Sequence, residues 1–264
     1  MTEYVHGYGT PEQERLVAQA EHWRHRLLSA GTVLAPGTRL LEVGCGVGAV
    51  LEVLGQEFPG LRLTGVDIEP KQLAFARQHL ERARVEAHLV EADALSLPFP
   101  DRSFDHVWMT WFLEHVSDPV AVLRESERVL LPGGSITAIE VDYSTCRAEP
   151  STPALEALFE TMVAGMAAAG WSDAGTRLPG WLREAGFVEV DEGERPFWWQ
   201  DDDLVRQARY AADVIESALP ALARLPGAVE GELRAGLADL RELPTRPDAG
   251  LGWIVHKSTA VAGT

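Results

Sequence analysis

The sequence predicts an α/β fold in which a doubly wound parallel sheet is covered by helices. Three observations indicate this fold class. Short apolar runs alternate with segments of helical periodicity between Arg39 and Val141. Closely spaced glycines follow the first apolar run, at residues 44–48. The chain has 264 residues, 46% of them hydrophobic, which is enough to bury a substantial core.

The elements can be placed in order along the first half of the chain. An amphipathic helix is expected over residues 11–30, because its apolar residues recur at helical spacing and Pro11 suits the first turn. The strands expected after it are 39–43, 61–66, 87–91, 104–111 and 135–141. The helices expected between them are about 49–57, 70–82 and 119–130.

The regular alternation of strand and helix patterns ends after Val141. Helical patterns cover residues 153–169, 179–185 and 202–243, and the last of them is broken near Pro220 and Pro226. Strands are expected at about 187–195 and at 251–256. We therefore expect a seven-stranded sheet with helical insertions after strands 5 and 6, in one domain. Its expected parts are an N-terminal lid and helix (1–36), a core (37–141), and late strands with cap helices (142–264).

Composition excludes several classes of function. The formal net charge of −17 opposes binding to nucleic-acid backbones. The two cysteines, Cys45 and Cys146, form neither a disulfide framework nor a metal-ligand pattern. The N-terminus has no apolar signal segment, and no window approaches the ~20 apolar residues of a membrane span. We expect a cytoplasmic protein without a metal, a nucleic-acid partner or a membrane anchor.

The glycine run LLEVGCGVGA at residues 40–49 fits two kinds of ligand. Gly44-x-Gly46-x-x-Ala49 matches a dinucleotide fingerprint, whereas Glu42 followed by alternating glycines suits a nucleoside that carries a sulfonium. Both ligands need a strand that ends in glycines, so that they can approach the main chain. A pyrophosphate favours the helix dipole without a nearby carboxylate, whereas a sulfonium is cationic. Glu42 therefore favours the sulfonium ligand.

Carboxylates follow the next two strands at the same edge of the expected sheet. Asp67 ends the second strand where a pair of ribose hydroxyls would lie, although dinucleotide enzymes share that acid. Asp93, after the third strand, can accept a hydrogen bond from an adenine amine. The fourth strand delivers Thr110, Trp111, Glu114 and His115 to this edge. These residues predict an adenosine-containing ligand.

Four blocks in order make the pattern more specific: LLEVGCGVG, LTGVDIEPKQLAFAR, VEADALSLPFPDRSFDHVWMTWFLEHV and LLPGGSITAIE. Over residues 37–141 the chain resembles the class I S-adenosylmethionine-dependent methyltransferases. It is most similar to the small-molecule branch that includes ubiquinone/menaquinone-type C-methyltransferases and natural-product N- and O-methyltransferases. The resemblance implies a Rossmann-like fold and transfer of a methyl group from S-adenosyl-L-methionine to a small-molecule N, O or C nucleophile. The product would be S-adenosyl-L-homocysteine.

The resemblance also implies which residues bind each part of this cofactor. The methionine part would be lined by Glu42, Gly44, Cys45 and Gly46. The ribose would be bound by Asp67 and Gln72, and the adenine by Ile68, Asp93 and Ala94. Thr110 and Trp111 would lie at the sulfonium side. In a subset of the branch the N-terminal tyrosines close over the cofactor, which implies a lid formed by Tyr4 and Tyr8.

Catalytic residues are harder to predict, because in-line methyl transfer depends mainly on positioning and needs a base only when the acceptor loses a proton. The candidates are His115, Glu140, Asp142 and Tyr143, of which the first three are predicted as catalytic. His115 titrates near neutral pH, but its turn also suits a structural cap. Glu140 and Asp142 alternate along a strand and share a face, which predicts carboxylates that point into the pocket.

Two other functions stay open at this point. A NAD-dependent oxidoreductase would use the same glycines, but it is disfavoured by Glu42 and by the absence of a Tyr-x-x-x-Lys pair around Lys71 and Lys257. A noncatalytic regulatory protein could keep the S-adenosylmethionine pocket without turnover. A homodimer is compatible with the small residues of the 153–169 helix.

Overall fold

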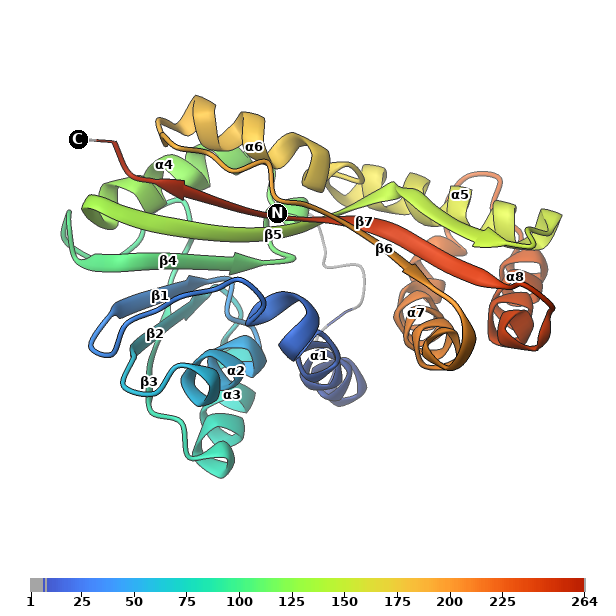
Figure 1. Ribbon diagram of the computed structural model, residues 1–264, viewed down its shortest axis with the longest axis horizontal. Coiled ribbons are helices and arrows are strands. Elements are labelled where there is room, and N and C mark those ends of the chain that lie inside the picture. Colours follow the sequence, from blue (N-terminus) through green and yellow to red (C-terminus); the bar gives the residue numbers. More distant parts are fainter. Residues whose placement is uncertain (1–6, 8, 264) are drawn as a thin grey trace.

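The computed structural model of the protein describes residues 7 and 9–263. Within this part of the chain, the central feature is a seven-stranded sheet with the order β3-β2-β1-β4-β5-β7-β6 (Figure 1). Strands β1 to β5 pair in parallel, and β7 runs antiparallel to both β5 and β6. The predicted α/β fold class is confirmed. The strands are β1 (Arg39–Val43), β2 (Arg62–Asp67), β3 (Ala87–Glu91), β4 (Phe104–Thr110), β5 (Leu130–Glu149), β6 (Glu194–Trp199) and β7 (Gly250–Val261).

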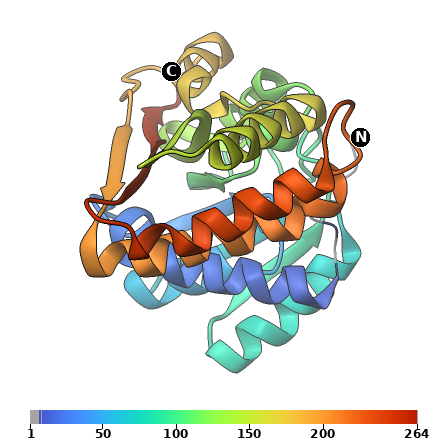
Figure 2. The same ribbon diagram turned by 90° about the vertical axis from the view of Figure 1, so that its right-hand side faces the viewer.

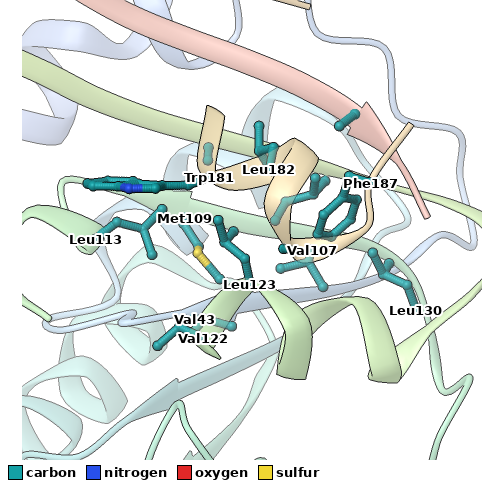
Figure 3. Packing of buried hydrophobic residues seen from close by; sticks show 14 of the residues in the cluster. Val43, Val107, Met109, Leu113, Val122, Leu123, Leu130, Trp181, Leu182 and Phe187 are labelled. Carbon is teal, nitrogen blue, oxygen red and sulfur yellow. The ribbon is translucent and has the colours of Figure 1, made fainter. Parts of the chain in front are cut away.

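Helices cover both faces of the sheet, and each face has its own hydrophobic cluster. On β4, Val107 and Met109 pack toward one face, whereas Trp108 between them packs toward the other. This double burial explains why the strands read as continuous apolar runs. Figure 3 shows the cluster between the sheet and two of the helices, α4 and α6. One face is covered by α1 (Thr10–Trp23), α2 (Ala49–Glu57) and α3 (Pro70–Ala83), and the other by α4 (Pro119–Val129) and α6 (Ala174–Ala185).

Three further helices lie beyond the carboxyl ends of the parallel strands (Figures 1 and 2). They are α5 (Pro153–Ala169), α7 (Asp201–Leu222) and α8 (Glu230–Glu242). Leu158, Leu219 and Leu237, one from each helix, belong to a third hydrophobic cluster. Strands β5 and β7 are long enough to reach this cluster, because they stay paired as far as Glu149 opposite Gly250. The insertions therefore cover the edge where the ligand site is expected.

Several boundaries differ from the sequence prediction. Strand β5 was expected only at 135–141, but two bulges allow it to run from Leu130 to Glu149. Strand β6 begins at Glu194 rather than near residue 187, after a segment that contacts β7 through the isolated bridge Val188–Val261 and a few further backbone hydrogen bonds. Helix α6 starts at Ala174, five residues before the predicted start, and holds Pro179 in its interior. The helical block expected over residues 202–243 is two helices, α7 and α8, so the break predicted near Pro226 is confirmed, whereas Pro220 lies inside α7.

The buried side chain of Lys257 joins β7 to the end of the first helix. After α1 the chain forms a π-helical segment, Arg24–Leu28, whose last carbonyls need hydrogen-bond donors. The Nζ atom of Lys257 donates to the carbonyls of Leu27 (2.7 Å), Leu28 (3.0 Å) and Ala30 (2.7 Å), and to Oγ1 of Thr32 (2.7 Å). Lys257 therefore fixes the end of the first helical segment to β7.

We expect Lys257→Met to lower the free energy of unfolding by roughly 3 kcal/mol, because several buried carbonyls lose a charged donor. Lys71→Met is the matched control, since Lys71 is exposed. Urea denaturation of both variants would measure the difference. A loss in Lys257→Met no larger than that in the control would contradict this role.

Candidate functional site

One cavity of about 640 Å³ lies at the carboxyl ends of the parallel strands. Two groups of residues line it, and we name a chamber after each group. The glycine-loop chamber is lined by Glu42, Gly44, Cys45, Gly46, Asp67, Ile68, Gln72, Asp93, Ala94 and Leu95. The aromatic chamber is lined by Trp23, Trp111, Glu114, His115, Tyr143, Cys146, Phe159, Met162, Tyr210, Val214, Ile215 and Trp253.

The glycine loop between β1 and α2 is fixed to β2 by its backbone. The N–H of Gly44 donates to the carbonyl of Val66 at 2.9 Å, and the N–H of Gly46 donates to Oδ2 of Asp67 at 2.8 Å. Both glycines have positive φ, of 73° and 48°, which an L side chain rarely adopts. A Cβ atom added to Gly46 would meet no protein atom within 4 Å. The loop is thus rigid and leaves open space beside its main chain.

Two carboxylates line this chamber together. Glu42 is 2% exposed, and among the described residues its Oε2 atom has no hydrogen-bond partner. Burial and the neighbouring Asp67 raise the pKa of Glu42 well above its ordinary value. Burial also raises the pKa of Asp67, whose Oδ1 atom accepts from the N–H of Glu69 at 2.9 Å. A buried oxygen without a partner indicates that a ligand supplies a donor at Glu42.

The other predicted cofactor residues are brought to the same cavity wherever the structure describes them. Gln72 accepts a hydrogen bond from Gln13 of α1 at 3.0 Å, which ties the first helix to the rim of the glycine-loop chamber. Trp111 has a φ of 49°, a strained value for a non-glycine residue and one that concentrates at functional sites. Their contacts with a cofactor stay predictions. Tyr4 and Tyr8 lie outside the described residues.

The three predicted catalytic residues do not lie together in the cavity. His115 lines the cavity, whereas Glu140 and Asp142 are absent from its lining, contrary to the expectation that they point into the pocket. The Oε1 atom of Glu140 accepts from the N–H groups of Phe112 (3.0 Å) and Leu113 (2.7 Å), so Glu140 holds the turn after β4 in position. Burial raises its pKa to about 8.

Asp142 has a different structural task. Its Oδ1 atom accepts from the N–H (3.0 Å) and hydroxyl (2.5 Å) of Ser144, and its Oδ2 atom accepts from the hydroxyl of Thr176. These bonds tie β5 to α6. The shared strand face predicted for Glu140 and Asp142 is therefore turned toward backbone and α6 rather than toward a substrate.

Three of the titratable side chains that do line the aromatic chamber, Glu114, His115 and Tyr143, form a buried cluster. The hydroxyl of Tyr143 donates to Oε1 of Glu114 at 3.0 Å, and Nε2 of His115 lies 3.3 Å from the same oxygen. Burial and the nearby charge of Glu140 raise the pKa of Glu114 well above its ordinary value. Burial lowers the pKa of His115 to about 4, so its imidazole is neutral at pH 7. The charged form of the buried Glu114 carboxyl is therefore disfavoured.

The aromatic walls come from segments far apart in the sequence. Trp23 at the end of α1 is 1% exposed, and its indole N–H donates to the hydroxyl of Tyr210 on α7 at 3.0 Å. Its ring centroid lies 6.4 Å from that of Trp111 and 6.3 Å from that of Trp253 on β7. Sequence reasoning missed this chamber, because no local pattern shows that α1, α7 and β7 meet.

Across the described helices, none has the length and apolarity to span a membrane.

Comparisons with known proteins agree with this architecture. Residues 41–138 match the family model described as a methyltransferase domain. The chain is 37% identical to the demethylmenaquinone methyltransferase of Thermus thermophilus over 45% of this chain and 53% of the relative. It is 38% identical to the 27-O-demethylrifamycin SV methyltransferase of Amycolatopsis mediterranei over 50% of this chain and 48% of the relative. The chain thus spans about half the length of these curated relatives.

A solved structure shows the same fold. It is the phosphoethanolamine N-methyltransferase 2 of Haemonchus contortus, in complex with phosphomonomethylethanolamine and S-adenosylhomocysteine. The similarity has a TM-score of 0.58 at 19% identity and covers 92% of this chain and 53% of that chain. The family match and the sheet order lead to one conclusion: residues 41–138 are similar to a methyltransferase domain, and the chain has the Rossmann-like fold of its structural neighbours.

Proposed function

We propose that the protein transfers a methyl group from S-adenosylmethionine to a small-molecule acceptor. One observation carries the proposal: Glu42 and Asp67 are two largely buried carboxylates that line the same chamber beside the glycine loop. Two negative groups would repel a pyrophosphate, but they suit an amino group, a sulfonium and a pair of ribose hydroxyls. The matched family, and the relatives named for methyl transfer to quinones and natural products, support the same reaction.

The residues of the glycine-loop chamber fit this cofactor. The unpartnered Oε2 atom of Glu42 can accept a hydrogen bond from the cofactor's amino group. Asp67 is held by two backbone N–H groups, and its remaining lone pairs can accept from ribose hydroxyls. Ile68 and Leu95 are exposed apolar side chains that line the chamber and offer contact surface to an adenine ring.

The chain's main task in methyl transfer is to hold and orient the reactants. When bound, S-adenosylmethionine supplies an electrophilic methyl group on a cationic sulfur. The glycine loop and Asp67 fix one reactant, and the aromatic chamber holds the other in a space from which its apolar walls exclude water. The strongly acidic chain favours a neutral or cationic acceptor over nucleic acid.

We expect Asp67→Ala to weaken binding of S-adenosylhomocysteine by roughly 1–3 kcal/mol, because buried hydroxyls would lose an acceptor. Titration calorimetry on wild type and variant measures the change directly. Asp105→Ala is the matched control, since Asp105 forms an ion pair with Arg39 (2.9 Å) at the amino end of β1 and does not line the cavity. Equal affinities for wild type and Asp67→Ala would remove Asp67 from the cofactor site.

Turnover distinguishes an enzyme from a noncatalytic binding protein that keeps the same pocket. The wild-type chain would be incubated with S-adenosylmethionine and a panel of phenols, amines and carbon acids, and S-adenosylhomocysteine would be quantified. We expect its formation to depend on one class of acceptor. Binding of the cofactor with no product from any class would favour the noncatalytic protein.

A further inference from the structure

The aromatic chamber contains a buried polar atom that the fold does not use. Glu114 is 2% exposed, and its Oε1 atom is occupied by the hydroxyl of Tyr143. Its Oε2 atom has no hydrogen-bond partner among the described residues, although Glu114 lines the cavity. Leaving a buried oxygen unpaired is costly, so an atom of this kind at a cavity wall indicates that a bound molecule completes it.

The surroundings of Glu114 favour a flat apolar molecule. The walls of the aromatic chamber are indole, phenyl, phenol and aliphatic side chains contributed by α1, α5, α7 and β7. Trp23 and Tyr210 already use their polar groups on each other. Rings of this kind offer large contact areas to another ring, by offset or edge-to-face packing.

The charges around the aromatic chamber disfavour an acceptor that carries a charge. An anionic acceptor would meet the carboxyl group of Glu114, and the only arginine among the described lining residues, Arg15, is paired with Glu12 at 2.7 Å and with Gln19. His115 is neutral at pH 7, because burial lowers its pKa to about 4. An ammonium would share the cavity with the positive sulfur of the cofactor. An uncharged acceptor is therefore favoured.

A hydroxyl is the uncharged group that best matches Oε2 of Glu114. It can donate to the oxygen of an ionised carboxylate and can accept from a protonated one, so it fits the side chain in either state. An ether can only accept, and an ammonium can only donate. Tyr143 holds the other oxygen and so fixes the direction in which Oε2 points.

We propose that the aromatic chamber binds an uncharged aromatic acceptor that carries a hydroxyl group, and that Oε2 of Glu114 forms the hydrogen bond to this hydroxyl. Tyr143 is a positioning residue for that bond. The inference rests on the proposed function, because it names the acceptor class of the same cavity. It also adds Glu114, rather than Glu140 or Asp142, as the carboxylate that touches the acceptor.

Titration calorimetry tests the inference on the full chain saturated with S-adenosylhomocysteine. The probes are 1-naphthol, its methyl ether 1-methoxynaphthalene and 1-naphthoate. We expect 1-naphthol to bind roughly tenfold or more tightly than each of the other two, since one lacks the hydroxyl and the other carries a negative charge. Equal affinities for 1-naphthol and its methyl ether would overturn the inference, and so would tighter binding of the carboxylate.

Two substitutions assign the preference to Glu114. Glu114→Leu should abolish the preference for 1-naphthol over 1-methoxynaphthalene, whereas Glu114→Gln, which keeps a hydrogen-bonding group, should retain part of it. Binding of S-adenosylhomocysteine to both variants shows that they are folded. An unchanged preference in Glu114→Leu would contradict the role of this residue. If wild type does not bind S-adenosylhomocysteine, the proposed function fails; if it binds but shows no preference for 1-naphthol, only this inference fails.

Discussion

Gly44→Ala should weaken binding of S-adenosylhomocysteine by tenfold or more, even if the variant still folds. Gly44 has a φ of 73°, a conformation that costs alanine roughly 1–2 kcal/mol. The added Cβ atom would also lie 2.2 Å from Cδ2 of Phe112, so the ring or the glycine loop must move. Either movement displaces the backbone beside Glu42 and Asp67. Since each 1.4 kcal/mol corresponds to about tenfold in affinity, these costs together predict the stated loss.

Gly133→Ala separates backbone strain from displacement of the loop. Gly133 has nearly the same φ, 75°, but an added Cβ atom would meet nothing within 4 Å. It lies in the bulge at the start of β5 and does not line the cavity. We expect this variant to lose about 1 kcal/mol of stability and no cofactor affinity. If both alanine variants bind S-adenosylhomocysteine with wild-type affinity, the glycine loop does not bind the cofactor.

Trp23→Ala should lower the free energy of unfolding by about 3–5 kcal/mol, the usual cost of truncating a large buried aromatic side chain. Trp23 is 1% exposed, and its ring centroid lies 5.1 Å from that of Phe197 and 6.0 Å from that of Trp199. The substitution also removes the hydrogen bond to Tyr210 and enlarges the aromatic chamber. Urea denaturation measures the loss of stability.

Trp198→Ala is the control for the loss of an indole outside the chamber. Trp198 is 37% exposed and packs beside the guanidinium of Arg147, whose Cζ atom lies 5.2 Å from the ring centroid. We expect a loss of about 1 kcal/mol, because much of this ring already faces water. Similar losses in the two variants would show that Trp23 is not the centre of the aromatic packing.

The sequence alone predicts much of the fold, because its signals are local. The alternation of apolar runs and helical segments located β1 to β4 and the helices between them to within a few residues. Parallel strands end at the same edge of a sheet, and this rule placed the carboxylates after β1, β2 and β3 around one cavity. The late strands were less accurate, because β5 continues through a bulge at residues 143–146 that no residue type marks.

The aromatic chamber could not be predicted, because it depends on tertiary packing. Trp23, Tyr210 and Trp253 are far apart in sequence and meet only when α1 and α7 fold over the sheet. The alternation rule gave Glu140 and Asp142 a shared face, but it could not show that Oε1 of Glu140 accepts from two backbone N–H groups and that Oδ2 of Asp142 accepts from Thr176. Glu114 stands beside His115 in the sequence, and it is distinguished from Glu140, whose Oε2 atom is also unpartnered among the described residues, by its place in the cavity lining.

The central claim is that the glycine-loop chamber binds a sulfonium nucleoside rather than a dinucleotide. Titration calorimetry of the wild-type chain with S-adenosylmethionine, S-adenosylhomocysteine and NAD, each in a separate experiment, tests it most directly. The buried carboxylates Glu42 and Asp67 predict saturable binding of both sulfur compounds and no heat from NAD. Tight binding of NAD without a response to either sulfur compound would contradict the claim.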